Sequence, residues 1–451
     1  MQEFEEGYCS HCFKKSKHIL EEKNYLRRNI YKCSNCDATT LKCRVPLCDN
    51  FARSGEYWDD ELCAEHAGEI ASFKTLDKKL EEIEDYKSLF ERDSINIKKV
   101  ATVGVVAIGA AAVVGPLVFV AAPAVGGAIG SLMGLSGAAA TNAGLAFIGG
   151  GAMAAGGLGM AGGAAILTAT GAALGGTLGG VVSNNYFGDI DNFDIKKVKD
   201  GKGKPVIFID GFLTQKNDDI NTWQEQLKEL YPNNPWYYVS WESKRLYDIG
   251  KLFVNLTSKE AIGDVALELA KTATKEGAKK LGPLNNVLTL LGLFNNPWSI
   301  AMVKAAETGV LLADILARTN KEYILCGHSL GARVIFYTLE ALSTKEKQYI
   351  NSVHLLGGAV GSNKKDWEIA KKAVSGKICN YKSSNDYVLA SFYKVGTFFT
   401  SAPIGRNDIN VNGVENIDVS DIVGRHSEYK KNFAKFAKVD NTKGFFGKIF
   451  G

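Results

Sequence analysis

The sequence predicts an α/β protein in which a doubly wound sheet fills the C-terminal half of the chain. Three observations lead to this fold and to the segments that precede it. After residue 203, short apolar runs alternate with longer segments of helical periodicity, as expected when helices cover both faces of a parallel sheet. Residues 101–188 contain no Asp, Glu, Lys or Arg. Seven of the nine cysteines precede residue 64, which indicates a small separate module.

A length of 451 residues leaves room for about three domains. The formal net charge of +4 is too small to indicate nucleic-acid binding, so we do not expect a nucleic acid as partner. The polar, charged N-terminus lacks the apolar core of a secretory signal peptide, which favours a cytoplasmic start. The expected segments are a cysteine-rich module at 1–66, an amphipathic helical linker at 67–99, a glycine-rich segment at 100–188, the sheet domain at 200–437 and a basic aromatic tail at 438–451.

The cysteines of the N-terminal module occur as close pairs, the last of which is completed by a histidine. Two thiolates two residues apart, about twenty residues from a second pair, are typical of tetrahedral Zn²⁺ sites. Disulfides are less favoured without an export signal. About two structural Zn²⁺ ions would therefore fold this module, with ligand pairs that are sequential or interleaved. The eight expected ligands are Cys9, Cys12, Cys33, Cys36, Cys43, Cys48, Cys63 and His66.

Two further features of the module are expected at its surface. His11 and His18 are predicted to be surface residues, since the ligand shells are complete without them. Several lysine and arginine residues indicate a solvated basic face, with contact to a protein or an anionic partner as the alternative.

Between residues 67 and 98, apolar residues recur at three-, four- and seven-residue steps, which predicts an amphipathic helix. The uncharged segment that follows is several times longer than the ~20 residues needed for one bilayer span. We predict that it inserts into a membrane as a helical hairpin, the alternative being a glycine-rich hairpin buried in protein. Lysines flank both of its ends. The cysteine module and the C-terminal domain are therefore both expected on the cytoplasmic side.

The stretch Gly327-His328-Ser329-Leu330-Gly331 fits the pattern G-x-S-x-G. Because the chain has 48 glycines, the pattern alone is weak and its context must support it. An apolar run at residues 323–326 predicts a buried parallel strand before the serine, and the residues after it favour a helix. This context is typical of a nucleophile elbow, in which Ser329 would be the nucleophile; a structural turn serine is the alternative.

Chain order then selects the partners of Ser329, because hydrolases with this elbow place the acid and the histidine after the serine. Two histidines follow it. His354 lies in a strand candidate soon after the serine and is expected in the core, which leaves His426 as the general base. Asp386 follows the apolar run at 378–381, where a strand would end, and is the expected acid. The competing carboxylates are Asp366, Asp408, Asp418 and Asp421.

These residues would support acyl transfer. His426 would accept the proton of Ser329, and Asp386 would hold the imidazole in the required tautomer. The N–H groups of Leu330 and Phe212 would bind the oxyanion, since Phe212 follows a second predicted strand at 206–209.

The runs "IDGFLT", "GHSLGARVIFYTLE", "LLGGAV", "YKSSNDYVL" and "GRHSEY", after a glycine-rich uncharged block, resemble the domain of unknown function 726 family of α/β hydrolases. That family includes transmembrane and coiled-coil domain proteins. The resemblance covers roughly residues 75–435 and leaves out the cysteine module. It implies an α/β-hydrolase fold and a Ser329, Asp386 and His426 hydrolase tied to a membrane. Asp210 stands where many lipases carry a histidine.

The sequence therefore predicts a membrane-associated serine hydrolase of the lipase or esterase type, acting on esters of membrane lipids or on other acyl esters. The alternative is a membrane-remodelling or pore-forming protein that uses the hydrolase fold as a scaffold. Phenylalanine and lysine residues alternate after residue 442, which predicts that the tail contacts an anionic bilayer surface.

Overall fold

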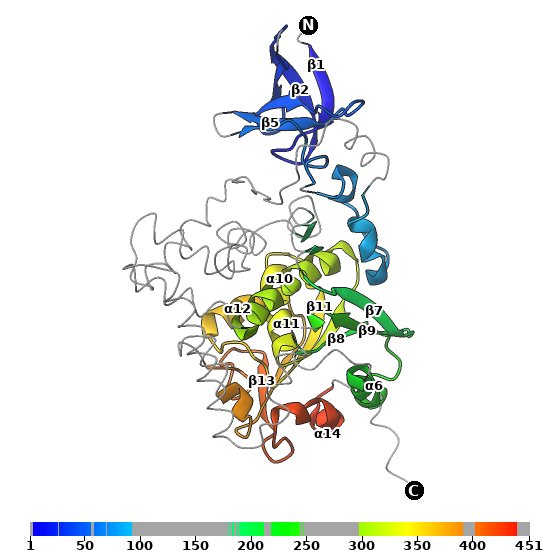
Figure 1. Ribbon diagram of the computed structural model, residues 1–451. Helices are drawn as coiled ribbons and strands as arrows, with labels where there is room; N and C mark the ends of the chain where they lie inside the picture. The colour runs from blue at the N-terminus through cyan, green and yellow to red at the C-terminus, as the bar shows by residue number, and fades with distance from the viewer. Residues whose placement is uncertain are drawn as a thin grey trace, which may run out of the picture. The chain divides into compact units, whose positions relative to one another are not determined.

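The computed structural model describes residues 3–92 apart from 26, 56–57 and 69, isolated positions between 180 and 188, and residues 190–211, 218–243, 246, 297–390 and 402–439. The chain divides into two compact units, one of residues 1–190 with 310–320 and one of residues 191–309 with 321–451. Figure 1 colours the chain from blue at the N-terminus to red near the C-terminus.

Two predicted segments fall on residues that the structure does not describe. The predicted membrane hairpin at 100–188 lies almost wholly outside the described residues, and so does the tail beyond residue 439. In the described part of the chain, no helix combines the length and apolar character needed to cross a bilayer.

The first unit contains a six-stranded antiparallel sheet whose strands follow one another in chain order. Its strands are β1 (Phe4–Tyr8), β2 (Lys15–Glu22), β3 (Ile30–Cys33), β4 (Thr39–Lys42), β5 (Phe51–Gly55) and β6 (Trp58–Asp59). One cysteine pair lies in the turn after β1, and a second pair has one member at the end of β3 and the other in the turn that follows. Several cysteines contribute to a small apolar cluster around Phe13, Val45, Ile70 and Phe73. This unit therefore builds much of its interior from thiol side chains.

The prediction that His18 lies at the surface is wrong. Strand β2 turns the side chain inward, where it is fully buried and its ring stacks on Phe51 with centroids 3.6 Å apart. Its Nδ1 lies 2.9 Å from the hydroxyl oxygen of Thr40. His11 is half-buried, with Nε2 3.1 Å from the carbonyl oxygen of Thr39. Packing between the strands thus buries histidine side chains, which the cysteine pattern did not predict.

The described part of the linker is not the continuous amphipathic helix predicted for residues 67–98. It forms two 3-10 helices, η1 (Phe73–Thr75) and η2 (Ile83–Leu89), joined by turns. Five apolar positions suggested a helix. Four of them are nevertheless buried, namely Phe73, Leu76, Leu80 and Ile83, and the fifth, Phe90, is partly buried. The periodicity identified the inward-facing residues correctly and their backbone conformation wrongly.

Arg318 explains why this backbone is not helical. It ends α10 (Pro297–Arg318), and its Nη1 donates to the carbonyl oxygens of Leu76 and Lys78 at 2.9 Å each. In return, the N–H of Leu80 donates to the carbonyl oxygen of Arg318 at 2.9 Å. These linker groups therefore form hydrogen bonds with α10 rather than within a helix of their own. The buried Nε of Arg318 also lies 3.0 Å from a carboxylate oxygen of Asp314.

The second unit contains a seven-stranded mixed sheet with the order β13-β12-β11-β10-β8-β9-β7. Its strands are β7 (Asp194–Lys199), β8 (Val206–Ile209), β9 (Trp236–Ser240), β10 (Tyr323–His328), β11 (Ile350–Leu356), β12 (Ile378–Lys382) and β13 (Val414–Asp418). Only β7 runs antiparallel to its neighbour; every other pair is parallel. The predicted α/β class is confirmed, as are the strands predicted at 206–209 and 323–326.

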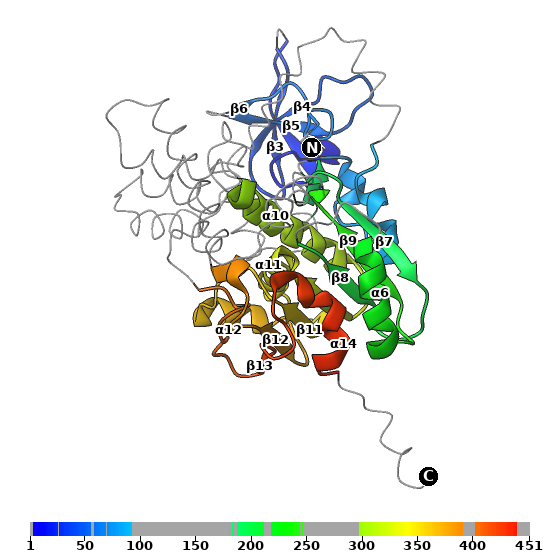
Figure 2. The same ribbon diagram turned by 60° about the horizontal axis from the view of Figure 1, so that its bottom comes forward.

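Helices cover both faces of this sheet, as Figures 1 and 2 show from two directions. The helices α6 (Asp218–Leu230) and α14 (Phe433–Phe436) pack on one face, where Trp223 and Phe433 join an aromatic core with Phe208 and Tyr381. On the other face, α11 (Leu330–Leu342) packs beside α12 (Lys364–Lys371) through Phe336 and Trp367. The helix predicted after Ser329 is confirmed as α11.

The strand order brings several strand ends together. Gly327 near the end of β10 pairs with Ile209 of β8 on one side and with Leu355 of β11 on the other. Because these strands are parallel, the loops that follow them emerge at one edge of the sheet, which is where ligand sites form in such sheets.

Replacing Arg318 by methionine is expected to lower the free energy of unfolding by about 3–5 kcal/mol, because a buried carboxylate and two linker carbonyl groups lose their charged donor. Chemical denaturation followed by circular dichroism measures the loss. Arg27→Met is the control, since Arg27 is exposed, and it should change stability by less than about 0.5 kcal/mol. Equal losses in the two variants would contradict the role assigned to Arg318.

Candidate active site and metal-binding groups

Ser329 occupies a strained turn between β10 and α11. Its backbone has φ 58° and ψ −118°, a combination that residues other than glycine rarely adopt. Two hydrogen bonds hold the turn: the N–H of Ser329 donates to the carbonyl oxygen of Leu356 at 3.0 Å, and the N–H of Ala359 donates to that of Ser329 at 3.0 Å. The turn therefore holds the serine side chain at the carboxyl end of the central strand.

The glycines on either side of Ser329 are required by close packing. A Cβ at Gly327 would lie 2.6 Å from Cδ1 of Ile335 and 2.8 Å from the nitrogen of Ala332, and a Cβ at Gly331 would overlap the carbonyl oxygen of Ile209. Any side chain at these positions would push α11 away from β8 and β10. The G-x-S-x-G spacing thus has a steric cause in this chain.

The structure brings the three predicted catalytic side chains into one hydrogen-bonded chain. Nε2 of His426 lies 2.8 Å from Oγ of Ser329, and Nδ1 of His426 lies 2.6 Å from a carboxylate oxygen of Asp386. A carboxylate only accepts, so Nδ1 donates to Asp386 and Nε2 accepts from the serine hydroxyl. All three side chains are buried. The arrangement is suited to proton transfer from the serine to the histidine.

Several hydrogen bonds fix Asp386 and the histidine loop. The other carboxylate oxygen of Asp386 accepts the N–H of Leu389 at 3.1 Å, and Arg406 Nη1 donates to the carbonyl oxygen of Asp386 at 2.9 Å. The hydroxyl of Ser383, in the acid loop, donates to the carbonyl oxygen of Val423 at 2.7 Å, just before the histidine. The sequence reasoning missed Arg406 and Ser383, because no local pattern marks a contact made across two loops.

The other candidates for the acid and the base have different surroundings. His354 is buried between two tyrosines, with Nε2 2.6 Å from the hydroxyl of Tyr231 and Nδ1 2.9 Å from that of Tyr381. Burial lowers the pKa of His354 to about 4, so it stays neutral. The predicted core role of His354 is confirmed. Carboxylate oxygens of Asp408 and Asp418 lie 3.2 and 3.7 Å from Nζ of Lys382, so both carboxylates pair with this lysine.

The oxyanion side of the site is described in part. Leu330 is the first residue of α11, where backbone N–H groups lack helical acceptors and the helix dipole favours negative charge. The other predicted donor, Phe212, lies outside the described residues. Gly211 precedes it, and a Cβ there would lie 2.7 Å from the Leu330 nitrogen and 2.8 Å from Cβ of Ser329. The end of β8 therefore lies directly against the serine.

His328 is a second histidine at the site that the sequence did not single out. It is buried, and its Nε2 lies 2.9 Å from the carbonyl oxygen of His426, so Nε2 donates. Burial, followed by the nearby His426 and Lys430, holds the pKa of His328 well below its usual value. A neutral His328 thus secures the backbone of the loop that bears His426.

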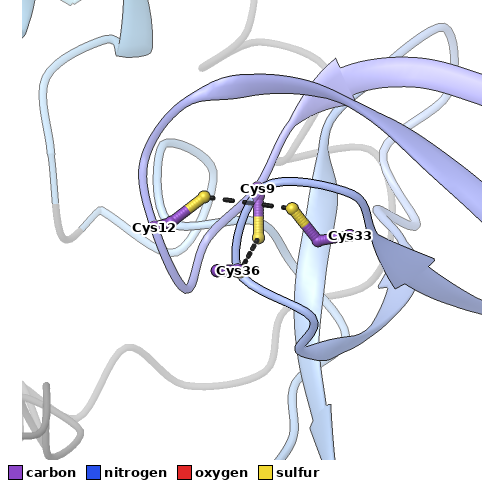
Figure 3. Close-up of side chains that lie close together, drawn as sticks. All are labelled: Cys9, Cys12, Cys33 and Cys36. Carbon is purple, nitrogen blue, oxygen red and sulfur yellow. Dashed lines mark hydrogen bonds between the residues drawn. The ribbon is translucent and has the colours of Figure 1, made fainter.

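The eight predicted metal ligands of the first unit form two groups of four. In one group, Sγ of Cys9 lies 3.9 Å from Sγ of Cys36, and Sγ of Cys12 lies 3.9 Å from Sγ of Cys33. Figure 3 shows these four side chains gathered around one point. The ligand atoms of each group all lie within 4.8 Å of one another. The first and second cysteine pairs along the chain therefore combine, and the interleaved alternative is excluded.

The second group consists of Cys43, Cys48, Cys63 and His66. Nδ1 of His66 lies 3.4 Å from Sγ of Cys43 and 3.3 Å from Sγ of Cys63, and the sulfurs of Cys48 and Cys63 are 4.0 Å apart. Tetrahedral Zn²⁺ with bonds of about 2.3 Å to sulfur would hold sulfur atoms about 3.8 Å apart, and sulfur and nitrogen slightly closer. Both groups have the donors and the spacing to hold metal ions.

Comparison with known proteins gives one family and several distant relatives. A family model described as "Protein of unknown function (DUF726)" matches residues 95–442. The chain is 29% identical over 59% of its length to the transmembrane and coiled-coil domain-containing protein STS1 of Oryza sativa subsp. japonica, and 28% identical over 60% to the probable lipase MIL1 of Saccharomyces cerevisiae. It is 30% identical over 54% to the uncharacterized membrane protein C6F6.13c of Schizosaccharomyces pombe.

The matches cover only part of these relatives. They span 41% of STS1, 26% of MIL1 and 32% of C6F6.13c, so the chain covers less than half of each. The family model begins at residue 95, after both groups of candidate metal ligands.

We expect protein purified without chelator to contain about two Zn²⁺ ions per chain, one for each group of four ligands. Replacing Cys33 by serine should lower the ratio to about one, because a structural site is normally four-coordinate. Elemental analysis by mass spectrometry measures the ratio. Cys379→Ala is the matched control, since Cys379 is buried in β12 and belongs to neither group, and it should keep both ions. Metal content near zero in the unaltered chain would exclude both sites.

Proposed function

The chain belongs to the DUF726 protein family, and we propose that it is a membrane-associated serine hydrolase of the lipase or esterase type. The hydrogen-bonded chain from Ser329 through His426 to Asp386 is the observation that carries the proposal. The name of one relative, a probable lipase, and the names of others as membrane proteins support it further.

The proposed fold of the second unit is that of an α/β hydrolase. Six neighbouring parallel strands, β8 to β13, carry the serine at the end of β10, which is the central strand of the seven-stranded sheet, and the acid after β12. The histidine follows β13 in the chain, which is the order of an α/β-hydrolase triad. The positive φ of Ser329 supports the same assignment, because a nucleophile elbow requires such a turn.

In the first half of the proposed reaction, Oγ of Ser329 attacks the carbonyl carbon of an ester while Nε2 of His426 accepts the hydroxyl proton. Asp386 stabilises the resulting imidazolium through Nδ1–H and remains a carboxylate. The N–H groups of Leu330 and Phe212 donate to the oxyanion. In comparable sites, each such donor stabilises the transition state by about 3–4 kcal/mol. The C–O bond to the alcohol then breaks, and the alcohol leaves with the proton from His426.

The second half repeats the same chemistry with water. Nε2 of His426 removes a proton from a water molecule, whose oxygen attacks the acyl-enzyme carbonyl carbon. The tetrahedral intermediate collapses, the bond between the acyl group and Oγ of Ser329 breaks, and Oγ takes the proton back from the histidine. The products are a carboxylic acid and an alcohol.

We place the substrate in a membrane. The uncharged segment at 100–188 is proposed to insert as a helical hairpin, with the lysines at its flanks holding both units on the cytoplasmic side. An enzyme held in this way meets esters of membrane lipids at high local concentration. Lipid or acyl esters are therefore the proposed substrate class.

We assign a structural role to the N-terminal metal groups. Zn²⁺ is the proposed ion, because one group has four thiolates and the other has three thiolates and one imidazole. Both sets are typical of tetrahedral zinc sites. Its binding would supply folding free energy to a unit with a small apolar core. A protein or an anionic surface is the proposed class of partner for this module.

Labelling by a fluorophosphonate probe tests the nucleophile. Ser329 should react covalently with the probe, and Ser329→Ala should abolish labelling because it removes the hydroxyl group that His426 activates. Ser343→Ala is the control, since Ser343 lies at the other end of α11, and it should label normally. Full labelling of Ser329→Ala would refute the assignment.

Activity against liposomes separates the hydrolase from a membrane-remodelling protein. A hydrolase should release fatty acid from ester lipids in proportion to intact Ser329, and Ser329→Ala should lower the rate by at least about 10³-fold. Dye leakage that is independent of Ser329, in the absence of ester cleavage, would instead favour a pore-forming or remodelling protein that uses the fold as a scaffold.

Deleting residues 101–188 tests the anchor. The shortened protein should move from the membrane pellet to the supernatant after carbonate extraction, because the apolar length that spans a bilayer is gone. Probe labelling of Ser329 in the same sample shows that the second unit remains folded. Deletion of residues 443–451 is the control and should leave the protein in the pellet. Retention of the 101–188 deletion in the pellet would contradict the proposed anchor.

A further inference from the structure

Asp210 and Lys430 form a buried ion pair beside the proposed catalytic residues. Asp210 is 1% exposed and Lys430 is 7% exposed, and Nζ of Lys430 lies 3.0 Å from Oδ1 of Asp210. The indole N–H of Trp223 donates to the same oxygen at 3.0 Å, and that of Trp241 donates to the Asp210 carbonyl oxygen at 3.1 Å. Within the described ranges, Lys430 is the one cation that pairs with this carboxylate.

Asp210 lies on the oxyanion side of the site. It directly follows β8 and precedes Gly211, which lies against Ser329 and the N–H of Leu330. The carboxylate and the carbonyl of Asp210 are each held by a donor from another element. The backbone that leads into the first oxyanion loop is thereby fixed at its start.

Lys430 belongs to the segment that carries the proposed base. His426 begins the 3-10 helix η5 (His426–Glu428), and Lys430 begins η6 (Lys430–Asn432) directly after it. His328 holds the first of these turns through the carbonyl oxygen of His426, and Lys430 holds the second through Asp210. The two contacts come from neighbouring strand ends, because Gly327 pairs with Ile209 immediately before them.

A buried ion pair at this place needs an explanation other than stability. Removing two charges from water costs several kcal/mol per ion, and apolar replacements of such pairs are often neutral or stabilising. The pair does, however, join the two parts of the site that must act together, the base on one side and the oxyanion backbone on the other.

We propose that Lys430 is a positioning residue, which sets the distance between the segment carrying His426 and the strand end carrying Gly211 through its ion pair with Asp210. This inference rests on the function proposed above. In this role Lys430 acts through Asp210 and not on the reacting atoms. Its effect is expected on the rate of the chemical step, since a displacement of about 1 Å in such a site can cost about 10²-fold.

Steady-state kinetics of the full-length protein on a soluble p-nitrophenyl ester test the proposal. Lys430→Met should lower kcat at least about tenfold while KM changes less than about threefold, because ground-state binding does not use the ion pair. Lys430→Arg should restore a substantial part of kcat, since arginine can keep the pairing with Asp210. Lys431→Met is the matched control. Lys431 is the next residue, its side chain is 57% exposed and pairs with Glu428, and kcat should not change.

Asp210→Asn provides a second route if Lys430→Met fails to fold. The variant keeps the size of the side chain and removes its charge, so kcat should again fall with little change in KM. Thermal unfolding of every variant is measured in the same buffer. An unchanged kcat in Asp210→Asn or in a folded Lys430→Met would overturn the positioning role. A loss of kcat that only matches the unfolded fraction of each variant, and that Lys430→Arg does not restore, would overturn it as well.

The same assay separates this inference from the proposed function. Ester turnover that survives Ser329→Ala would refute the hydrolase assignment itself. Turnover that depends on Ser329 but is unaffected by the Lys430 and Asp210 variants would refute the positioning role alone.

Discussion

At Ser329 the backbone turns through φ 58° and ψ −118°, and this turn determines where the other parts of the site must lie. The turn is possible because Gly327 and Gly331 let α11 approach β8 and β10 without a side chain between them. The approach aims the N-terminus of α11 at the serine, where its dipole and N–H groups favour negative charge. Packing of one helix on two strands thus creates the position, the strain and the electrostatic environment of Ser329 together.

The remaining site residues are held by contacts between loops that are distant in the chain. His426 reaches Ser329 and Asp386 because His328 and the acid loop hold the backbone of its own loop. These partners are buried, so each missing hydrogen bond would leave a polar group without water to replace it. The loops at this edge of the sheet are therefore rigid because their buried polar groups must stay hydrogen-bonded. Catalysis by preorganised groups requires such rigidity.

Buried charge serves a similar purpose in each unit. In the first, Arg318 replaces helical hydrogen bonds of the linker by bonds to its guanidinium group, while Asp314 balances its charge. In the second, Lys430 and Asp210 join the segment that carries His426 to the end of β8. The two groups of candidate metal ligands would act in a similar way, because a tetrahedral ion would cross-link turns that a small apolar core holds weakly. In all three places a specific interaction supplies a geometry that apolar packing alone would leave loosely defined.

The sequence by itself determined the features that depend on local chain chemistry. Apolar runs marked the strands, glycine spacing marked the turn at Ser329, chain order selected Asp386 and His426 as its partners, and paired cysteines marked the candidate metal ligands. The tertiary structure decided how these parts combine. It joined the cysteine pairs sequentially, buried His18, replaced the predicted linker helix by 3-10 turns and brought Lys430 to Asp210. The physical reason is that these outcomes depend on contacts between residues far apart in the chain, which leave no periodic trace in either partner's own sequence.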